Sequence, residues 1–341
     1  QRGQHFLFVD DANDGSGRLA GMGGVLVRDG FVDGTPMPVG YLGDLRTRGF
    51  VRERLAFPQV YAHFFHQIVE ETGCEHHLTA ILADNEAAAR ALTDPAASST
   101  STSTTTGKHA RRRPQPHYHL LTPYDMANVH FIRRRRAAPT PGLRVRRATL
   151  ADLPAITALL AADHKRRPFG WRFDDGEFEH RLAQWPGFTL DETFVVHDHR
   201  DVLRAVTTCW DPHAVKRYRV MRYGGQMLVV KTAMSLAARL TKMAPLPDVG
   251  GDFRSFYLTN LSVKDDDPRV FAALIDAVYA AHVDDGYHFF SFPLYPHDPL
   301  AAGTTGHLVR RVPFLLYGVT SSAVRRTAWP AGRPGFEMAL A

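Results

Sequence analysis

Cysteines and long apolar runs are what this sequence has least of. Cys74 and Cys209 are the only cysteines among 341 residues, and they stand far apart. This argues against a disulfide framework or a thiolate metal cage and favours a reducing cytoplasm. No apolar run approaches the roughly 18 residues that a membrane-spanning helix needs. Residues 1–20 lack the basic and then apolar order of a signal peptide, so we expect a soluble, cytoplasmic protein without integral membrane association.

The excess of positive charge does not come with a nucleic-acid-binding pattern. The net charge is +6, but much of the excess lies in two clusters, Arg111–Arg113 and Arg133–Arg136. Recognition-helix motifs, zinc-finger spacings and aromatic ribonucleoprotein signatures are missing from the sequence. Histidine pairs such as His63 and His66 have no carboxylate at ligand spacing. We therefore expect neither a nucleic-acid partner nor a metal site.

The length and composition predict two domains. With 44% hydrophobic residues, 341 residues can form two ordinary cores. A Ser/Thr-rich run followed by a basic stretch predicts a flexible insertion over residues 95–116. Two prolines and a glycine within residues 137–142 mark the boundary between the predicted domains. The domains are then residues 1–138 and 143–341.

A short internal repeat links the two predicted domains. Tyr41-Leu-Gly-Asp-Leu-Arg46 aligns with Tyr257-Leu-Thr-Asn-Leu-Ser262, and a long helix, a glycine and a strand follow each run. Gly73 follows Tyr41 by 32 residues, and Gly286 follows Tyr257 by 29. The two stretches therefore predict one supersecondary unit that is used twice, with chance agreement of two six-residue runs as the alternative.

Hydrophobic periodicity predicts the elements around this repeat. Thr149 is a plausible N-cap of a helix with apolar residues at helical spacing, and Gly21–Gly24 favours a tight hairpin. The amphipathic stretch 226–243 favours a lid or a packing helix over a membrane-surface helix. The predicted strands of the second domain are 143–146, 193–196, 202–210, 256–263 and 287–294, with closing strands at 309–319 and 335–340.

This order of elements resembles that of the GNAT (general-control-related N-acetyltransferase) superfamily, in two copies that cover nearly the whole chain. Asn85-Glu-Ala-Ala-Ala-Arg-Ala-Leu92 resembles the Asn-x-x-Ala helix start of that family and is its most specific match. The resemblance implies an α/β (α+β) fold of two tandem GNAT-like domains, each with a mixed, mostly antiparallel sheet flanked by helices. The first copy lacks the family's opening strand and helices, and we expect a missing N-terminal segment, with a naturally short version as the alternative. In the first copy, residues 6–9, 22–28 and 39–46 resemble the family's second to fourth strands. Residues 58–72 resemble its CoA-facing helix, and residues 78–82 resemble its fifth strand.

The resemblance implies an acyl-CoA as co-substrate, acetyl-CoA or another, held in the first domain. The family binds the CoA pyrophosphate at a turn that opens a helix, where unpaired N–H groups favour an anion. The second-domain turn, Lys264–Pro268, has no glycine and three carboxylates, so we expect no ordinary CoA binding there. A helix N-terminus with favourably placed aspartates explains that acidic run equally well. The implied cofactor-binding residues of the first domain are Leu45, Arg46, Arg48, Gly49, Phe50, Val51, Arg52 and Asn85.

The first-domain turn departs from the family's pattern. Arg46 and Gly49 keep the Arg-x-x-Gly spacing, but Val51 stands where a Gly or Ala is expected. The arginines can still contact phosphate oxygens, although a solvated basic turn explains them as well.

Acetyl transfer to an amine needs a base for the amine and an acid for the departing thiolate. Asp44 is the base candidate, because it is the ionisable member of a pair whose second-domain counterpart is Asn260. Its alternative role is to orient Arg46 or nearby backbone. The family's acid, a Tyr, falls on Leu92 in this sequence. Tyr124, or else Tyr118, is the substitute that we assign.

These assignments predict an acyl-CoA-dependent N-acyltransferase that acts on an amine of a small molecule or an amino-acid-like acceptor. Two other functions remain open. One is a catalytically degenerate GNAT-like protein that binds a ligand or regulates, which Val51, Leu92 and the acidic run favour. The other is acyl transfer from an acyl-carrier protein, whose acidic surface suits the arginines of residues 46–54.

Overall fold

The computed structural model describes residues 4–11, 19–47, 57–93, 114–134, 139–174, 176–225, 227–228, 231–232, 235–236, 244–321, 332–337 and 339. Most of the insertion predicted over 95–116 lies outside these residues, as do most of the stretch 226–243 and part of the boundary at 137–142. The described pairs within 226–243 are helical.

The described residues form a large sheet that continues through both halves of the chain. Its order is β1-β2-β3-β4-β13-β5-β12-β11-β8-β7-β6, which makes 11 strands, and β9 and β10 pair separately. The strands of the first half are β1 (Gln4–Asp11), β2 (Leu19–Val32), β3 (Thr35–Thr47), β4 (His76–Leu82) and β5 (His117–His130). The others are β6 (Leu143–Arg147), β7 (Thr193–Asp198), β8 (Leu203–Trp210), β9 (Tyr218–Arg219), β10 (Asp252–Phe253), β11 (Ser255–Val263), β12 (Phe289–Leu294) and β13 (Leu308–Thr320).

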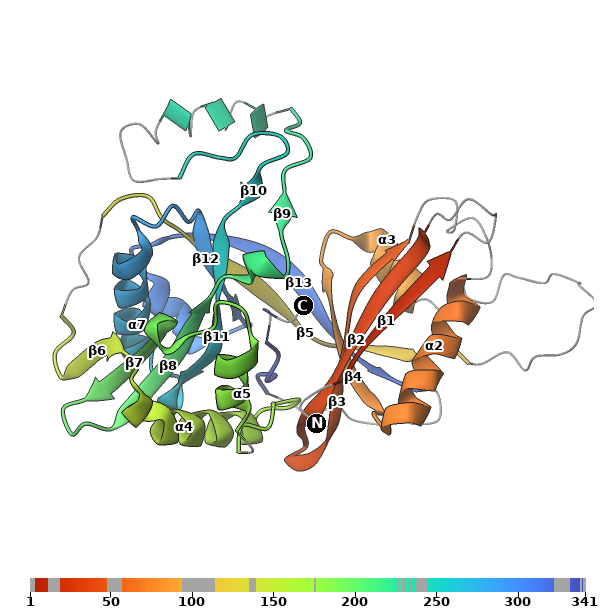
Figure 1. Cartoon of the computed structure of the whole chain (residues 1–341), viewed down its shortest axis with the longest axis horizontal. Helices are drawn as coiled ribbons and strands as arrows, with labels where there is room; N and C mark the ends of the chain where they lie inside the picture. The colour runs from red at the N-terminus through yellow and green to blue at the C-terminus, as the bar shows by residue number, and fades with distance from the viewer. Residues whose placement is uncertain are drawn as a thin grey trace, which may run out of the picture.

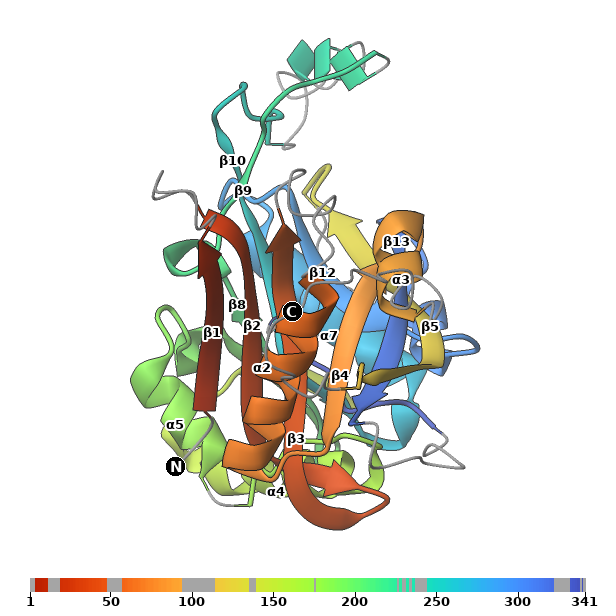
Figure 2. The same ribbon diagram turned by 90° about the vertical axis from the view of Figure 1, so that its right-hand side faces the viewer.

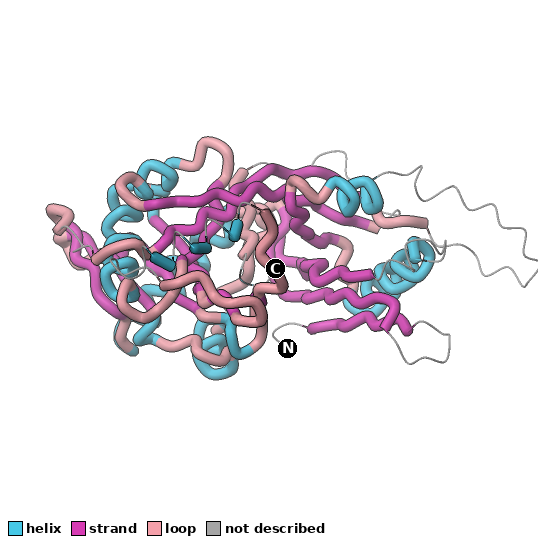
Figure 3. The backbone as a smooth tube through the Cα atoms, turned by 90° about the horizontal axis from the view of Figure 1, so that it is seen from above, coloured by secondary structure: helices cyan, strands magenta, loops and turns pink. Residues whose placement is uncertain are grey.

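Two strands are exchanged between the halves. β12 pairs along its whole length with residues 125–130 of β5, while β13 pairs with β5 on one side and with β4 on the other. Figure 1 shows β5 and β13 running between the right-hand lobe, which holds β1–β4, and the left-hand lobe. Seen from above, the strands continue from one lobe into the other (Figure 3). The strand predicted at 309–319 is therefore confirmed, but its partners lie in both halves.

The predicted repeat is confirmed in backbone geometry. β3 pairs in parallel with β4 only as far as Tyr41, and β11 pairs in parallel with β12 only as far as Tyr257. Beyond these tyrosines both strand pairs separate. Three residues later Asp44 and Asn260 each have φ 52, a left-handed conformation that bulges the strand. The sequence alignment had paired these two residues.

Helices cover both faces of the sheet. α2 (Phe57–Thr72) lies across β1–β4 (Figure 2), where Phe65 and Ile68 pack on Val25 and Leu42. α7 (Pro268–His282) covers the corresponding face of the second half. The other helices are α3 (Glu86–Thr93), α4 (Leu153–Arg166) and α5 (Glu177–Gln184), with the short 3₁₀ helices η1 (Leu150–Asp152), η2 (Leu190–Glu192), η3 (Pro212–Ala214), η4 (Lys264–Asp266) and η5 (Pro299–Thr304).

The second half supplies the cover for the remaining face of the first half. Val39 and Tyr41 belong to one core cluster with Phe169 and Trp171, which follow α4, and with Phe336 near the C-terminus. The backbones approach closely there. A Cβ atom on Gly335 would lie 2.4 Å from the Cα of Gly170. Only glycine fits such a contact, so the interface between the halves depends on it.

Two predicted elements are wrong. Gly21–Gly24 lies inside β2, which pairs on both sides, and the hairpin turn falls at Asp33 and Gly34 instead. The described part of 335–340 is not a strand, because this segment lies in a gap between strands of the second half. The helix start at Thr149 is confirmed, since Thr149 and Asp152 form a reciprocal capping box at η1.

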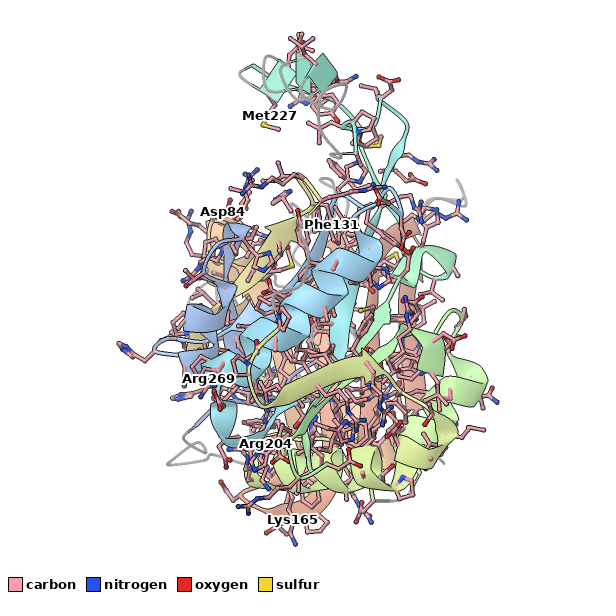
Figure 4. All side chains as sticks on the ribbon, turned by 90° about the vertical axis from the view of Figure 1, so that its left-hand side faces the viewer. Asp84, Phe131, Lys165, Arg204, Met227 and Arg269 are labelled. Atoms are coloured by element: carbon pink, nitrogen blue, oxygen red, sulfur yellow. The ribbon has the colours of Figure 1, made fainter. Side chains whose placement is uncertain are left out.

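None of the described helices is long and apolar enough to cross a membrane. A short arm projects beyond the sheet where β9 and β10 pair. In Figure 4, Met227 lies in this arm, at the opposite end of the molecule from Lys165, the penultimate residue of α4.

Candidate functional site

A cavity of about 740 Å³ opens where β3 and β4 separate. Its walls come from both halves, because the exchanged strands β5 and β13 and the second-half strands β11 and β12 complete it. Most of the lining is apolar and includes Phe64, Ile81, Leu92, Val312 and Phe314. A cavity of this size and character suits a small-molecule ligand of considerable length.

The predicted base Asp44 lines this cavity at the bulge of β3. Its carboxylate lies 3.6 Å from Lys216 Nζ and 3.8 Å from Arg46 Nη2, and the side chain is about half exposed at 49%. The contact with Arg46 is the alternative role that the sequence analysis left open. Lys216 comes from the second half and was not identified from the sequence.

The predicted donor-binding residues are only partly described. Leu45 and Asn85 line the cavity, and Arg46 lies beside Asp44. The Asn85 Oδ1 atom accepts the N–H of Ala88 at 3.2 Å, so Asn85 caps α3 as its position at a helix start predicts. Arg48, Gly49, Phe50, Val51 and Arg52 lie outside the described residues.

Six tyrosines line the cavity, and the predicted acid Tyr124 is one of them. Burial, followed by the nearby phenols of Tyr41, Tyr295 and Tyr257, raises the pKa of Tyr124 far above its usual range. The ring stacks on Phe314 at 5.3 Å. A phenol in this environment stays protonated at neutral pH and is a hydrogen-bond donor.

The alternative acid Tyr118 is also in the lining, but its hydroxyl is bound. It forms a short hydrogen bond with the hydroxyl of Tyr61. Burial, and then the neighbouring Tyr61, raises the pKa of Tyr118 well above 10. Both candidate acids thus reach the cavity with protonated hydroxyls.

The corresponding gap in the second half is nearly full. A cavity of only about 30 Å³ remains between β11 and β12, lined by Asn260, Tyr295 and the chain's own segment 333–337. Glu337 Oε1 accepts the backbone N–H of Asn260 at 3.0 Å, directly at the bulge. The C-terminal segment therefore occupies the position at which the first half has an open cavity.

A buried network of charges holds this segment in place. Arg181 Nη1 donates to both carboxylate oxygens of Glu337 at 2.7 Å and to Asn260 Oδ1 at 2.7 Å, and its side chain is fully buried. Burial opposes ionisation of Glu337, but the attraction of Arg181 outweighs it and lowers the pKa of the carboxyl. Glu177 links Arg181 to Arg28 of β2, each at 2.8 Å, so the network reaches the first half.

The three aspartates of the acidic run, residues 265–267, make structural contacts within the second half. Asp267 Oδ1 accepts the N–H of Arg269 and caps α7, as the helix-terminus reading predicts. Asp265 pairs with Arg204 at 3.0 Å, and Asp266 pairs with Arg333 at 3.1 Å. None of the three aspartates lines the cavity of about 740 Å³ or the one of about 30 Å³.

A cluster outside the cavity has possible metal-ligand atoms, which the histidine spacings did not indicate. Glu192, Cys209 and His282 have ligand atoms within 4.8 Å of one another. His282 Nδ1 lies 2.9 Å from Asp285 Oδ2, within hydrogen-bond distance, and Arg147 Nη1 lies 3.6 Å from Glu192 Oε1. None of the three residues lines the cavity.

Sequence reasoning missed the second-half contribution to the cavity. Lys216, Tyr218, Tyr257 and Arg310 all line it, together with Asn128 of the exchanged strand β5. The repeat gave the one available signal, since it aligns Tyr257 with Tyr41. The other positions follow from long-range strand pairing, which no local pattern reveals.

Comparisons with known proteins identify the fold. No protein-family model matches this sequence, and no curated protein matches it. Among solved structures, a GCN5-related N-acetyltransferase from Sphaerobacter thermophilus superposes with a TM-score of 0.51 at 10% identity, over 89% of this chain and 77% of that one. An N-myristoyltransferase from Saccharomyces cerevisiae, solved with bound myristoyl-CoA, superposes with a TM-score of 0.53 at 11% identity, over 90% of this chain and 65% of that one.

The chain therefore shares the fold of these solved N-acetyltransferase and N-myristoyltransferase structures, a large mixed sheet flanked by helices. It spans about two thirds of the N-myristoyltransferase chain that it resembles. At these identities the likeness concerns the fold, and the chemistry has to be argued from the cavity itself.

Proposed function

We propose that this protein is an acyl-CoA-dependent N-acyltransferase of two tandem GNAT-like units, whose first unit holds the acyl donor. The observation that carries the proposal is the open cavity at the separation of β3 and β4, beside the bulge at Asp44. The equivalent separation in the second half is filled by the segment around Glu337. The similar solved structures include an enzyme with a bound acyl-CoA, which supports the same class of donor.

In this proposal the neutral amine of the acceptor attacks the thioester carbonyl carbon. A C–N bond forms, the C–S bond breaks, and the amine loses a proton. Asp44, directly or through water, takes that proton. Tyr124 donates a hydrogen bond or a proton to the departing thiolate. Apart from Asp44, Lys216 and Arg310, the described lining has no carboxylate, ammonium or guanidinium group, so it keeps the thioester in largely apolar surroundings.

The cavity also bears on the length of the acyl chain. Its volume of about 740 Å³ and its apolar lining leave room for more than an acetyl group. Acetyl-CoA remains one candidate donor, and acyl chains of medium length are the other. Both cysteines are free and buried, and we place the reaction in a reducing cytoplasm on that basis.

Calorimetry with the full chain tests the donor site. Acetyl-CoA, octanoyl-CoA and dodecanoyl-CoA are titrated into the wild type, Arg46→Glu and the control Arg90→Glu, which reverses an exposed arginine on α3. We expect a Kd in the micromolar range for at least one donor. Arg46→Glu should weaken it at least ~10-fold by removing a charge-assisted contact, and Arg90→Glu should leave it unchanged.

Two results would contradict the proposal. No heat with any acyl-CoA would exclude a CoA donor, and heat with an acylated carrier protein alone would assign the donor to that class. Equal affinity for Arg46→Glu and wild type would remove Arg46 from the site.

A further inference from the structure

A row of polar side chains crosses four neighbouring strands in the wall of the cavity. In the strand register Arg310 of β13 lies opposite Asn128 of β5, which lies opposite Ser291 of β12, which lies opposite Tyr257 of β11. All four residues line the cavity. With neighbouring strands about 4.8 Å apart, the row is about 14 Å long between its end residues.

The middle of the row is a fixed and buried pair. Ser291 Oγ donates to Asn128 Oδ1 at 2.7 Å, and the two residues are only 2% and 6% exposed. The side-chain oxygen of Asn128 accepts this bond, so its NH₂ group can donate two further hydrogen bonds. Arg310 lies opposite Asn128 on the neighbouring strand. This end of the row is therefore a cluster of hydrogen-bond donors.

Arg310, an exposed residue of β13, gives the cluster a positive charge. It makes no ion pair among the described residues, whereas Arg311, the next residue on β13, pairs with Asp125. The described lining has two cationic side chains, Lys216 and Arg310, and a single carboxylate, Asp44, which already pairs with Lys216. The lining therefore has one unmatched positive charge, at Arg310.

The remaining ionisable group at this end is neutral at physiological pH. His130 is two residues from Asn128 on the same face of β5 and also lines the cavity. Burial, and then the charges of Arg310 and His288, lower its pKa. A neutral imidazole leaves Arg310 as the cation that attracts an anionic group.

The other end of the row leads back to Asp44. The hydroxyls of Tyr257 and Tyr218 are 3.1 Å apart, and Lys216 Nζ lies 5.9 Å from the centre of the Tyr218 ring. Lys216 then pairs with Asp44. The proposed base and the unmatched Arg310 thus lie at opposite ends of one polar track through an otherwise apolar cavity.

We propose that the acceptor carries a carboxylate as well as its reactive amine, with the carboxylate bound by Arg310 and the Asn128 amide and the amine directed toward Asp44. The acceptor class is an amino acid or a short peptide with a free C-terminus. This inference rests on the proposed function for the identity of the amine as nucleophile, whereas the carboxylate site stands on the geometry of the row.

Matched libraries test the carboxylate. A set of amino acids, dipeptides and tripeptides with free carboxylates is compared with the same compounds as C-terminal carboxamides. Binding to the full chain is measured by calorimetry at up to 10 mM, and acyl transfer is measured by thiol release with the donor that binds best. We expect the preferred carboxylates to exceed their carboxamides at least ~10-fold in affinity and in kcat/KM, because the charge-assisted bond to Arg310 is lost.

Two neighbouring variants localise the effect. Arg310→Gln should abolish the preference for the carboxylate and leave acyl-CoA affinity unchanged. Arg311→Gln is the matched control, since successive strand residues face opposite sides of the sheet, and it should keep the preference. Asn128→Asp places a negative charge in the cluster and should reverse the preference toward the carboxamides.

The outcomes separate this inference from the proposed function. Equal use of carboxylates and carboxamides, or no binding by any carboxylate, overturns the carboxylate site. Loss of acyl-CoA affinity in Arg310→Gln also overturns it, because Arg310 would then serve the donor. Carboxylate binding without any acyl-CoA binding would support the site and contradict the transferase.

Discussion

The two gaps in this molecule have the same backbone geometry and opposite contents. In each, two parallel strands separate after a tyrosine, and a residue with φ 52 bulges the strand three positions later. The first gap holds a cavity of about 740 Å³, whereas the second keeps about 30 Å³ around the segment 333–337. Repetition of a fold therefore does not repeat a binding site.

The side chains at the two bulges show how the halves diverge. Asp44 presents a carboxylate to the open cavity, where its partners are the cations Lys216 and Arg46. Asn260 presents an amide to a buried network. Its side-chain Oδ1 accepts from Arg181, and its backbone N–H donates to Glu337. In the second half, the carboxylate of Glu337 occupies the position that corresponds to the open cavity of the first half.

The largest expected effect comes from removing the charge at the open bulge. Asp44→Asn should lower the rate of acyl transfer by about 10²–10⁴-fold, the usual contribution of a positioned base. Donor affinity should stay the same, because the carboxylate acts on the acceptor amine. Single-turnover kinetics at a series of donor concentrations measure both.

Asp33→Asn is the control for this substitution. Asp33 has a similar backbone conformation, φ 53, in the β2–β3 turn, and it does not line the cavity. If Asp44→Asn keeps the transfer rate of the wild type, Asp44 orients Arg46 or Lys216 and is not the base.

The next effect is on stability and belongs to the filled gap. Glu337→Ala removes one partner of a fully buried ion pair and leaves Arg181 without its main counter-charge. Loss of a single partner from such a pair costs about 3–5 kcal/mol in the free energy of unfolding. Denaturant unfolding measures this, with Glu86→Ala, in an exposed pair on α3, as a control that should change it by less than about 0.5 kcal/mol.

If Glu337→Ala unfolds at the same denaturant concentration as the wild type, the segment does not hold the second half together. A gain of acyl-CoA binding by Glu337→Ala, in place of a loss of stability, would show that the filled gap is a second donor site under autoinhibition.

A smaller loss of stability is expected at Gly40, a position that the two halves pack differently. Gly40 of β3 corresponds to Phe256 of β11, and its partner His77 corresponds to Phe290. A Cβ on Gly40 would lie 2.0 Å from His77 Cδ2. Gly40→Ala should therefore cost about 1–3 kcal/mol by overpacking.

The double variant Gly40→Ala/His77→Ala checks the cause. If the clash with the imidazole is responsible, the double variant should lose less stability than the sum of the two single variants. Additive losses would place the cost in the backbone of Gly40.

The smallest effect is a pH dependence of stability at His77, whose position corresponds to Phe290 in the second half. Burial, and then His76, lower the pKa of His77 to about 3. Because the unfolded chain binds this proton near pH 6.5 and the folded chain does not, the contribution of His77 to stability falls as pH drops below 6.5. Between pH 7.5 and 5.5 the loss is about 1.4 kcal/mol.

His77→Phe, which introduces the residue type of the second half, should remove this part of the pH dependence. His63→Gln, on the exposed side of α2, is the control and should retain it. An unchanged pH dependence in His77→Phe would mean that other buried histidines account for the acid sensitivity.

Local signals in the sequence were sufficient for the repeated unit. The alignment of Asp44 with Asn260 put these residues at equivalent positions of the repeat, and the structure has a bulge at each. Asn85 was placed at a helix start, where it caps α3. The acidic run before Pro268 was correctly explained as a helix N-terminus, since Asp267 caps α7. Each of these features depends on residues within one or two turns of the chain.

The rest of the site depends on pairings that local patterns do not encode. Arg310 reaches the cavity because β13 lies between β4 and β5, and Asn128 reaches it because β5 pairs with β12. The apolar alternation of β13 fits any half-buried neighbour, so it predicts a strand without naming its partners. Likewise Glu337, in a segment expected to be a strand, is bound by Arg181, which is 156 residues earlier.

The place of β13 in the sheet also constrains the order in which the protein can become active during synthesis. The ribosome releases the first 134 residues well before residues 308–320, and a nascent chain folds from its N-terminal side. Until β13 arrives, β4 is paired only with β3, and the cavity lacks the wall that includes Arg310, Val312 and Phe314. A partly synthesised chain therefore cannot hold a complete site, and activity should appear on translation only after the thirteenth strand has left the ribosomal tunnel.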